Sequence, residues 1–164
     1  MAMSPVGIPR SLASMRRLGL LALLVGAFFL SCGPALALRL PSEDEGRRVR
    51  VHAMWNRHYL CLAAKVPDVM LTGTSTGPMS TPEQDDAVEF SLEIPGQPEI
   101  AAYRLVISAA GGMTLFSRDS RGHWRTDPSW ISGPRTIKYA VSADGTLNDP
   151  SDTDGGYVIE WALP

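Results

Sequence analysis

Apolar and polar residues alternate in short runs along most of the chain after residue 48, which is the pattern of β-strands with one buried face. The clearest run is 87–94, where Val88, Phe90 and Leu92 alternate with polar residues. Residues 47–164 show no helical period over three turns. The alternation predicts strands over residues 49–55, 59–66, 87–94, 103–109, 113–117, 136–143 and 157–163. We therefore expect an all-β fold, an antiparallel and jelly-roll-like β-sandwich.

Turn residues separate these predicted strands. Asn56-Arg57-His58 and Ala110-Gly111-Gly112 each lie between two apolar runs, which predicts two hairpins. Stretches without periodicity predict three loops, over residues 72–84, 118–135 and 144–156. The last predicted strand runs to Pro164 without a polar tail, which would leave an open sheet edge unprotected. We therefore expect the domain to continue beyond this sequence.

The N-terminal residues have the parts of a secretory signal in the usual order. Basic residues precede an uncharged, mostly apolar run of 13 residues, 18–30, which is shorter than the roughly 20 residues of a membrane span. Ala35-Leu36-Ala37 then supplies small residues at the positions that signal peptidase reads. We expect a signal peptide over 1–37, a linker over 38–46 and one folded domain over 47–164, incomplete at its C-terminal end. The protein would then be exported, as a secreted, periplasmic or cell-surface protein.

The two cysteines allow a second interpretation of the N-terminus. Phe29-Leu30-Ser31-Cys32 loosely resembles a lipobox, in which the cysteine becomes lipidated and attaches the protein to a membrane. Cleavage after Ala37 would instead remove Cys32 and leave Cys61 as the single cysteine of the folded domain, so we expect no internal disulfide. Cys61 lies in an apolar run, where a small buried side chain is expected.

Charge narrows the range of partners. The formal net charge is −2, from 15 basic and 17 acidic residues, and three of the basic residues lie in the predicted signal peptide (Arg10, Arg16, Arg17). The expected mature domain is therefore more acidic than the whole chain. Nucleic-acid binding needs clustered cations, so this balance argues against it. Neutral sugars and divalent cations remain compatible with an acidic surface.

Two acidic clusters lie in the predicted loops. One is Asp85-Asp86, which opens a strand, and the other runs from Asn148 to Gly156. Clustered oxygen ligands with glycine at sharp turns suit Ca²⁺, so we expect structural calcium. The expected carboxylate ligands are Asp85, Asp86, Asp152 and Asp154. The alternative is turn chemistry, in which Asp and Asn side chains bond the nearby backbone.

Tryptophan supplies the candidate ligand-binding residues. Flat aromatic rings stack on the apolar faces of sugars while polar neighbours bond the hydroxyl groups. Trp130 and Trp124 lie in a polar loop where core packing does not require them, and Trp55 ends a predicted strand. Trp161 lies on the apolar face of the last strand, which indicates a core residue. We expect stacking by Trp130, Trp124 and Trp55, with Asn148 among the polar groups.

The sequence carries few features of a catalytic site. No Gly-x-Ser-x-Gly or Cys-x-x-Cys motif occurs, and the 3 histidines lack metal-ligand spacing. Carboxylate pairs exist, so the residue types alone leave a two-acid glycosidase open. We expect this chain not to be an enzyme by itself, although it could be part of a larger glycoside-active enzyme.

Several short motifs follow one another in a definite order between residues 49 and 164. They are Trp55-Asn56-Arg57-His58-Tyr59-Leu60, Asp85-Asp86-Ala87-Val88-Glu89-Phe90, Tyr103-Arg104-Leu105, Asp144-Gly145-Thr146-Leu147-Asn148 and Asp152-Thr153-Asp154-Gly155-Gly156-Tyr157 with Glu160-Trp161-Ala162-Leu163-Pro164. In this order they resemble the family 9 carbohydrate-binding modules and family-9-like sugar-binding domains. Two departures are that the family's opening Asp-Gly segment is missing from 38–48 and that Tyr157 replaces a more usual Trp.

The resemblance implies a β-sandwich with bound calcium that recognises sugars of polysaccharides, such as xylan or cellulose, by tryptophan stacking. It also implies further strands after Pro164. A different class of function is an electron-transfer sandwich that holds haem between side chains such as Met54, Met113, His52 and His123. A third is a structural surface domain with an empty site.

Overall fold

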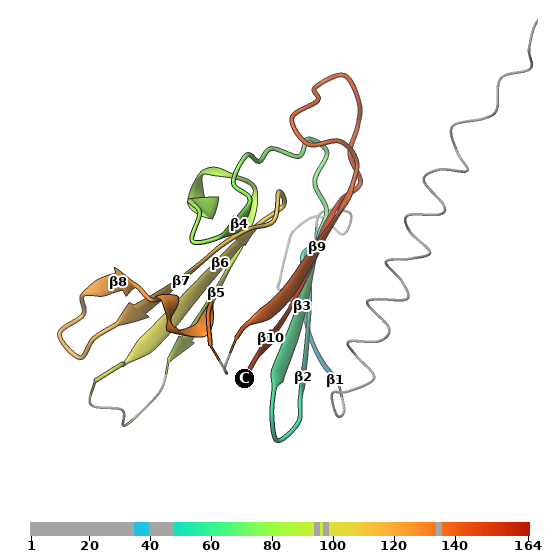
Figure 1. Ribbon diagram of the computed structural model, residues 1–164. Coiled ribbons are helices and arrows are strands. Elements are labelled where there is room, and N and C mark those ends of the chain that lie inside the picture. The colour runs from blue at the N-terminus through green and yellow to red at the C-terminus, as the bar shows by residue number, and fades with distance from the viewer. Residues whose placement is uncertain (1–34, 40–47, 94–95, 97–98, 134–135) are drawn as a thin grey trace, which may run out of the picture. The chain divides into compact units, whose positions relative to one another are not determined.

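The computed structural model describes residues 48–93, 96, 99–133 and 136–164, together with the backbone of residues 35–39. Two layers of strands make up the described chain, and short 3₁₀ turns are its only helical elements. No helix in these ranges is long and apolar enough to cross a membrane. The antiparallel β-sandwich expected from the alternation is confirmed, and both layers are visible in Figure 1.

The first sheet has five antiparallel strands in the order β1-β2-β3-β10-β9. Their bounds are β1 Ala35–Arg39, β2 Arg50–Trp55, β3 Leu60–Val66, β10 Gly156–Leu163 and β9 Lys138–Asp144. The last strand of the chain, β10, therefore lies between β3 and β9. Because β10 has neighbours on both sides, its buried residues alternate poorly with exposed ones, although its apolar positions still face the core.

The second sheet has the order β4-β7-β6-β5, with β8 paired to the free side of β7. Its strands are β4 Gly77–Pro78, β5 Ala87–Glu93, β6 Ala102–Ser108, β7 Gly112–Arg118 and β8 Trp124–Thr126. The two-residue strand β4 pairs with β7 in parallel, and the other pairs are antiparallel. Two 3₁₀ turns, η2 Pro82–Gln84 and η3 Pro128–Trp130, lie in the connections.

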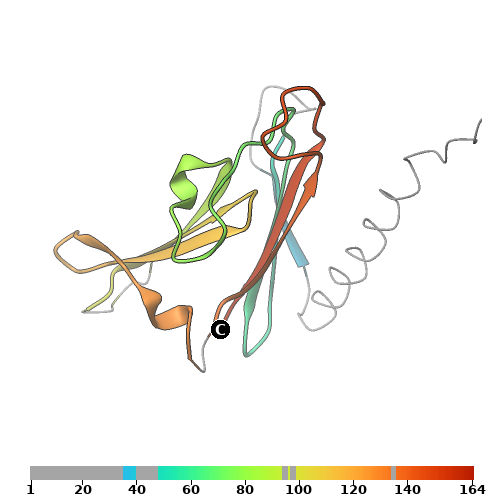
Figure 2. The same ribbon diagram turned by 45° about the horizontal axis from the view of Figure 1, so that its top comes forward.

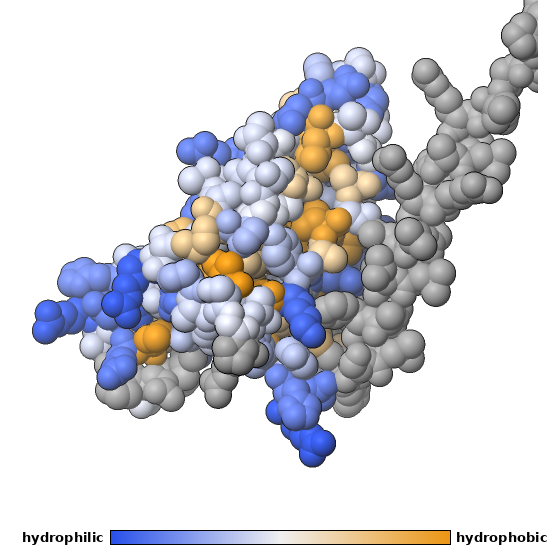
Figure 3. Space-filling model, in the orientation of Figure 1, coloured by the Kyte–Doolittle hydropathy of each residue, from blue (hydrophilic) through white to orange (hydrophobic). Residues whose placement is uncertain are grey.

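The core forms where the facing sides of the sheets meet. Ile159 and Trp161 of β10 pack with Ile107 and Leu115 of the second sheet in one cluster. Phe90 of β5 meets Trp161 edge-on, with ring centroids 5.9 Å apart. Seen from the side of Figure 3, apolar residues reach the surface near β9 and near β5 and β6, in separate patches with hydrophilic residues around them. The expectation that Trp161 is a core residue is confirmed, since it is 2% exposed.

The loops expected over 72–84 and 118–135 contain more structure than the sequence indicated. The first holds β4 and η2, and the second holds β8 and η3. These elements are two or three residues long, which is too short for the repeat of a helix or of a strand to be recognised in the sequence. Strand β1 begins two residues before Ala37, the expected cleavage position, and pairs Ala37 with His52. The first two residues of the expected linker, 38–46, belong to β1, and the rest of that linker and of the expected signal peptide lies outside the described residues.

The expectation about cysteine was wrong. We expected no disulfide in the folded domain, but Cys61 is disulfide-bonded, and no free cysteine occurs among the described residues. Its burial is as expected, since 6% of its surface is exposed. Period-2 alternation places it on the outer face of the first sheet, because its neighbour Leu62 is in the core. The other cysteine of the sequence, Cys32, lies outside the described residues.

Candidate functional site

The strands of the sandwich end in two separate groups of loops and turns, one at each end. At one end lie the β2–β3 hairpin, the end of β5, η3 and the end of β10, and at the other lie the segment after β3 and the β9–β10 loop. Antiparallel pairing of β3 with β10 sets this division, because Leu163 lies opposite Leu60 and Tyr157 lies opposite Val66. Figures 1 and 2 both show η3 beside the C-terminal end. We call the first the cleft end and the second the loop end.

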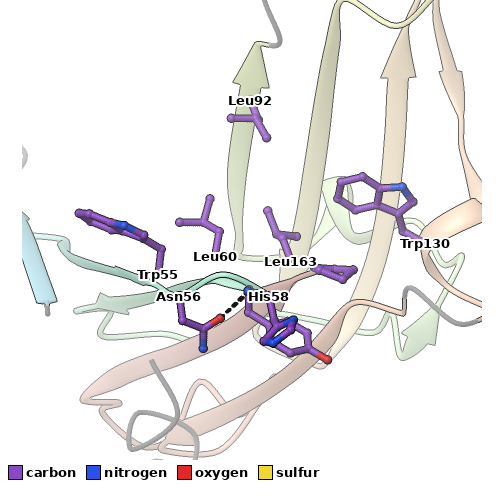
Figure 4. Close-up of a pocket in the computed structure, with 9 residues that line it drawn as sticks. Trp55, Asn56, His58, Leu60, Leu92, Trp130 and Leu163 are labelled. Atoms are coloured by element: carbon purple, nitrogen blue, oxygen red, sulfur yellow. Dashed lines mark hydrogen bonds between the residues drawn. The ribbon is translucent and has the colours of Figure 1, made fainter. Parts of the chain in front are cut away.

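A cavity of about 250 Å³ opens at the cleft end, between the two sheets. Leu60 and Leu163, which are paired in register, form its floor with Leu92 of β5. Figure 4 shows the indoles of Trp55 and Trp130 on opposite sides of these leucines. The lining is therefore an apolar surface between two aromatic rings.

The two indoles are held to different extents. Trp55 is the last residue of β2, and 54% of its surface is exposed although it belongs to an apolar run. Trp130 ends η3 and is partly buried, with its ring 4.7 Å from the ring of Tyr103 and tilted by 36°. The backbone of Trp130 also accepts a hydrogen bond from Ile137 N–H at 2.8 Å. Trp130 is thus anchored to the core, whereas Trp55 projects from the end of a strand.

Polar groups line one side of this cavity, and they come from the turn between β2 and β3. Asn56 Oδ1 accepts hydrogen bonds from the backbone N–H groups of His58 and Tyr59, both at 2.8 Å. That bonding fixes the conformation of the turn. The Lys138 ammonium lies 5.4 Å from the centroid of the Tyr59 ring, outside the leucine floor. The cavity thus combines apolar stacking surface with a few hydrogen-bonding groups.

At the loop end, an extended segment of residues 71–75 lies between the two sheets. Its backbone forms hydrogen bonds with carboxylate and amide side chains that come from the loops of both sheets. On the side of the first sheet, Asp154 Oδ2 accepts from Leu71 N–H at 2.6 Å, and Asn148 exchanges two hydrogen bonds with the backbone of Gly73. On the side of the second sheet, Asp86 Oδ2 accepts from Thr72 N–H, and Asp85 accepts from the N–H groups of Thr74 and Ser75. We call residues 71–75 the bridging segment.

The carboxylates of Asp85, Asp86 and Asp154 at the loop end accept hydrogen bonds from backbone N–H groups. Asp154 is 5% exposed, and its other oxygen accepts from Thr146 N–H at 2.8 Å. A side chain at Gly145 would collide with this carboxylate, so glycine is needed there. Burial raises the pKa of Asp85, but hydrogen bonds from Thr74, Ser75 and Ser108 outweigh it and hold that pKa below its ordinary value. These side chains therefore bond backbone groups as the alternative to calcium proposed, but most of the groups are distant in sequence and not in a local turn.

The expected calcium ligands do not form one cluster. Within the described residues, no group of three or more His, Cys, Asp or Glu side chains is arranged to hold a metal ion. Asp85, Asp86 and Asp154 bond different N–H groups of the bridging segment, and Asp152 is exposed. The present donor set does not fit a calcium site, and the calcium expectation stays a prediction for experiment.

Of the expected sugar-binding residues, Trp55 and Trp130 meet in one cavity and the other two lie elsewhere. Asn148 belongs to the loop end, where both atoms of its amide group bond Gly73. Trp124 belongs to β8 and faces away from the core. Tyr59 and the leucine floor were not expected, because their positions in apolar runs gave them the pattern of core residues.

Of the side chains suggested for haem, His52 and Met54 lie two residues apart on β2 and share its outer face, whereas Met113 and His123 lie elsewhere. Met113 is buried in the core at 1% exposure, and His52 is exposed on β2. His123 is exposed in the β7–β8 hairpin, where it lies 3.4 Å from the carboxylate of Asp119. None of these four side chains lines the cavity at the cleft end.

Comparison with known proteins gives a likeness in fold. No model of a known protein family matches the chain, and no curated protein matches it in sequence. Its fold is similar to that of a crystal structure from Bacteroides uniformis described as a "putative carbohydrate-binding protein". The two chains are 16% identical with a TM-score of 0.56, and the match covers 85% of this chain and 64% of the other. The chain thus spans less than two thirds of that protein, and at this identity the likeness shows a shared fold.

Proposed function

We propose that this chain is a non-catalytic carbohydrate-binding domain of an exported protein, and that it binds sugar rings in the cavity between Trp55 and Trp130. The observation that carries the proposal is the placement of two indoles around an apolar floor at the open end of a sandwich. Trp55 is more than half exposed although it ends an apolar strand, and Trp130, although packed on Tyr103, also lines the cavity.

The chemistry of a pyranose ring matches this cavity. A sugar presents apolar C–H faces that stack on aromatic rings, and hydroxyl groups at its edge that need hydrogen-bond partners. Here the apolar faces would meet the two indoles and the leucine floor. The imidazole of His58, which also lines the cavity, would meet hydroxyl groups. We propose neutral polysaccharides and their oligosaccharides as ligands, beginning with cellulose and xylan.

The composition of the cavity supports binding without catalysis. Glycoside hydrolysis generally needs two carboxyl groups on either side of the scissile bond. The described residues that line this cavity include no Asp or Glu. A glycoside-active domain elsewhere in a longer protein remains part of the proposal, because binding domains of this kind bring a substrate to a neighbouring enzyme.

The fold and the motif order add independent support. The similar protein from Bacteroides uniformis carries carbohydrate binding in its description, and the two chains share a sandwich architecture. Membership of family 9 itself stays a prediction from the order of the motifs in this sequence. Sandwich folds host many functions, so the cavity carries more of the argument than the fold does.

Affinity measurements on single tryptophan variants test this function. We expect the parent protein to bind cellohexaose or xylohexaose by isothermal titration calorimetry, and Trp55→Ala to weaken binding by about ten- to a hundredfold. That range corresponds to the loss of about 1–3 kcal/mol per stacked ring, by analogy with bases stacked on aromatic residues. Met79→Ala, which removes an exposed apolar side chain outside the cavity, is the matched control. Equal affinities of Trp55→Ala and the parent would contradict the proposed site.

Export has a separate test. We expect the protein recovered outside the cytoplasm to begin at Leu38, as the arginine-rich start and Ala35-Leu36-Ala37 indicate. The intact mass of the exported protein and its N-terminal sequence measure where the chain starts. A lipid-modified Cys32 at the N-terminus would show the lipobox interpretation to be correct, and an uncleaved chain would contradict cleavage after Ala37.

A further inference from the structure

The outer face of the second sheet carries an exposed aromatic residue that the cavity does not use. Trp124 pairs in register with Arg118, and paired residues of antiparallel strands point to the same face. Met113 and Leu115 of β7 lie in the core, so Arg118, Phe116 and Trp124 lie on the opposite side of the sheet. Trp124 is 40% exposed. It therefore faces away from the core side, where Trp130 packs against Tyr103.

Two guanidinium groups accompany this indole. The Cζ atoms of Arg104 and Arg118 lie 5.5 and 5.4 Å from the centroid of the Trp124 ring. Arg104 also lies over Phe116, with its Cζ atom 4.4 Å from that ring centroid. The result is a stacked tier of four side chains across β6, β7 and β8.

Acidic residues hold both guanidinium groups in position. Arg118 donates to Glu93 Oε1 at 3.0 Å. Arg104 lies 3.8 Å from a carboxylate oxygen of Glu89 and 4.0 Å from one of Glu83. Two cations therefore face three anions, so the tier offers no excess positive charge. An anionic polymer finds no electrostatic attraction here, whereas a neutral ligand finds donors and acceptors side by side.

The hairpin that carries Trp124 is braced as well. Asp119 Oδ1 accepts hydrogen bonds from the backbone N–H groups of Arg121 and His123, both at 2.9 Å. Asp127 N–H donates to the carbonyl of Leu115 at 2.8 Å, which fixes the other end of β8. A ring held in place loses little conformational entropy when it binds a ligand.

We propose that this tier is a second binding surface for a neutral glycan chain, with Trp124 as the stacking ring and the paired Arg and Glu side chains as partners of the hydroxyl groups. A pyranose has the required combination of an apolar face, several hydroxyl groups and no charge. The inference rests on the proposed function of the domain but not on the cavity at the cleft end, since the sheet separates the two surfaces. Two surfaces on one domain would bind an insoluble polysaccharide more tightly than a short soluble oligosaccharide.

Depletion assays on insoluble cellulose and xylan test this inference. The proteins compared are the parent, Trp124→Ala, Trp124→Tyr, Trp55→Ala and the double variant Trp55→Ala/Trp124→Ala. Val69→Ala removes another exposed apolar side chain and is the matched control. Thermal unfolding of each variant establishes that it is folded, and Trp124→Tyr keeps an aromatic ring if Trp124→Ala unfolds. Polygalacturonate, an acidic polymer, serves as the charged probe.

We expect Trp124→Ala to weaken adsorption by about tenfold or more, Trp124→Tyr to recover part of the loss, and the double variant to adsorb least. Loss of adsorption in Trp124→Ala with Trp55→Ala unaffected would support this surface and contradict the cavity. Loss in Trp55→Ala with Trp124→Ala equal to the parent would overturn this inference and leave the proposed function intact. No adsorption by the folded parent would overturn both. Binding of polygalacturonate through Trp124 would overturn the neutral-glycan assignment.

Discussion

The loop end and the cleft end of the sandwich are both rich in residues that suggest function, but they use these residues differently. At the loop end, the carboxylates of Asp85, Asp86 and Asp154 accept backbone N–H groups of residues 71–75. At the cleft end, the indoles of Trp55 and Trp130 face a cavity.

This comparison teaches how to separate structural from binding residues. A polar side chain whose atoms are all bonded within the protein stabilises the fold, because an unpaired buried donor or acceptor costs free energy. An exposed aromatic ring beside an apolar cavity, such as that of Trp55, does not stabilise the strand that carries it in this way. The acidic clusters were the more conspicuous signal in the sequence, yet the tryptophans are better placed to bind a ligand.

The largest expected effect is that of Asp154→Ala on stability. The substitution leaves the N–H groups of Leu71 and Thr146 without their acceptor, and a hydrogen bond to a charged group contributes about 1.5–3 kcal/mol. We expect the free energy of unfolding in urea to fall by about 3 kcal/mol or more. Asp152→Ala, two residues away and exposed, is the control and should change it by less than about 0.5 kcal/mol. Similar losses in both variants would contradict the role assigned to Asp154.

The next effect separates the two indoles of the cleft end. Trp130→Ala should reduce both glycan affinity and stability, because this ring packs on Tyr103. We expect it to lower the free energy of unfolding by about 1–2 kcal/mol, less than the roughly 3–5 kcal/mol of a fully buried ring. Trp55→Ala should reduce affinity alone. Urea unfolding and calorimetric titration of both variants measure the difference, and equal stability losses would show that Trp55 is also a packing residue.

Acid should weaken the hydrogen bonds that Asp85 accepts at the loop end. The pKa of Asp85 is lower in the folded protein than its ordinary value, so its contribution to stability is present above about pH 4 and is lost as the pH falls through the lowered value. We expect the melting temperature to fall below about pH 4, with a shallower fall in Asp85→Asn. Trp55→Ala should keep the slope of the parent. An unchanged slope in Asp85→Asn would show that other carboxyl groups, such as Asp127, dominate.

The smallest expected effect is that of chelation. The backbone N–H groups already bond the carboxylates of the loop end, so we expect a chelator to leave the melting temperature unchanged. Added Ca²⁺ should likewise not raise it, since only a ligand that binds the native state stabilises by mass action. A clear fall on chelation that Ca²⁺ reverses would instead establish the calcium dependence that the acidic clusters and the family resemblance predicted.

Local pattern determined the strands and the turns of this protein. Alternation located β5 and β10 to within about a residue, because a strand with one buried face repeats every two residues whatever its partners are. The Ala110-Gly111-Gly112 hairpin was also foreseen, and Gly111 adopts the positive φ of 89° that glycine permits. Short elements such as β4 and β8 were not predicted, since two or three residues are too few to show a repeat.

Tertiary structure alone decided which of the candidate residues share a site. Asp152 and Asp154 are alike in sequence, but only Asp154 meets Leu71, which is 83 residues away. Trp124 and Trp130 lie six residues apart in one predicted loop, yet β8 places the first on the outer face and η3 places the second at the cleft. Backbone preference acts over a few neighbouring residues, whereas a site depends on how distant strands pair. The pairing of Leu60 with Leu163 is therefore what forms the cavity floor, and no local pattern contains it.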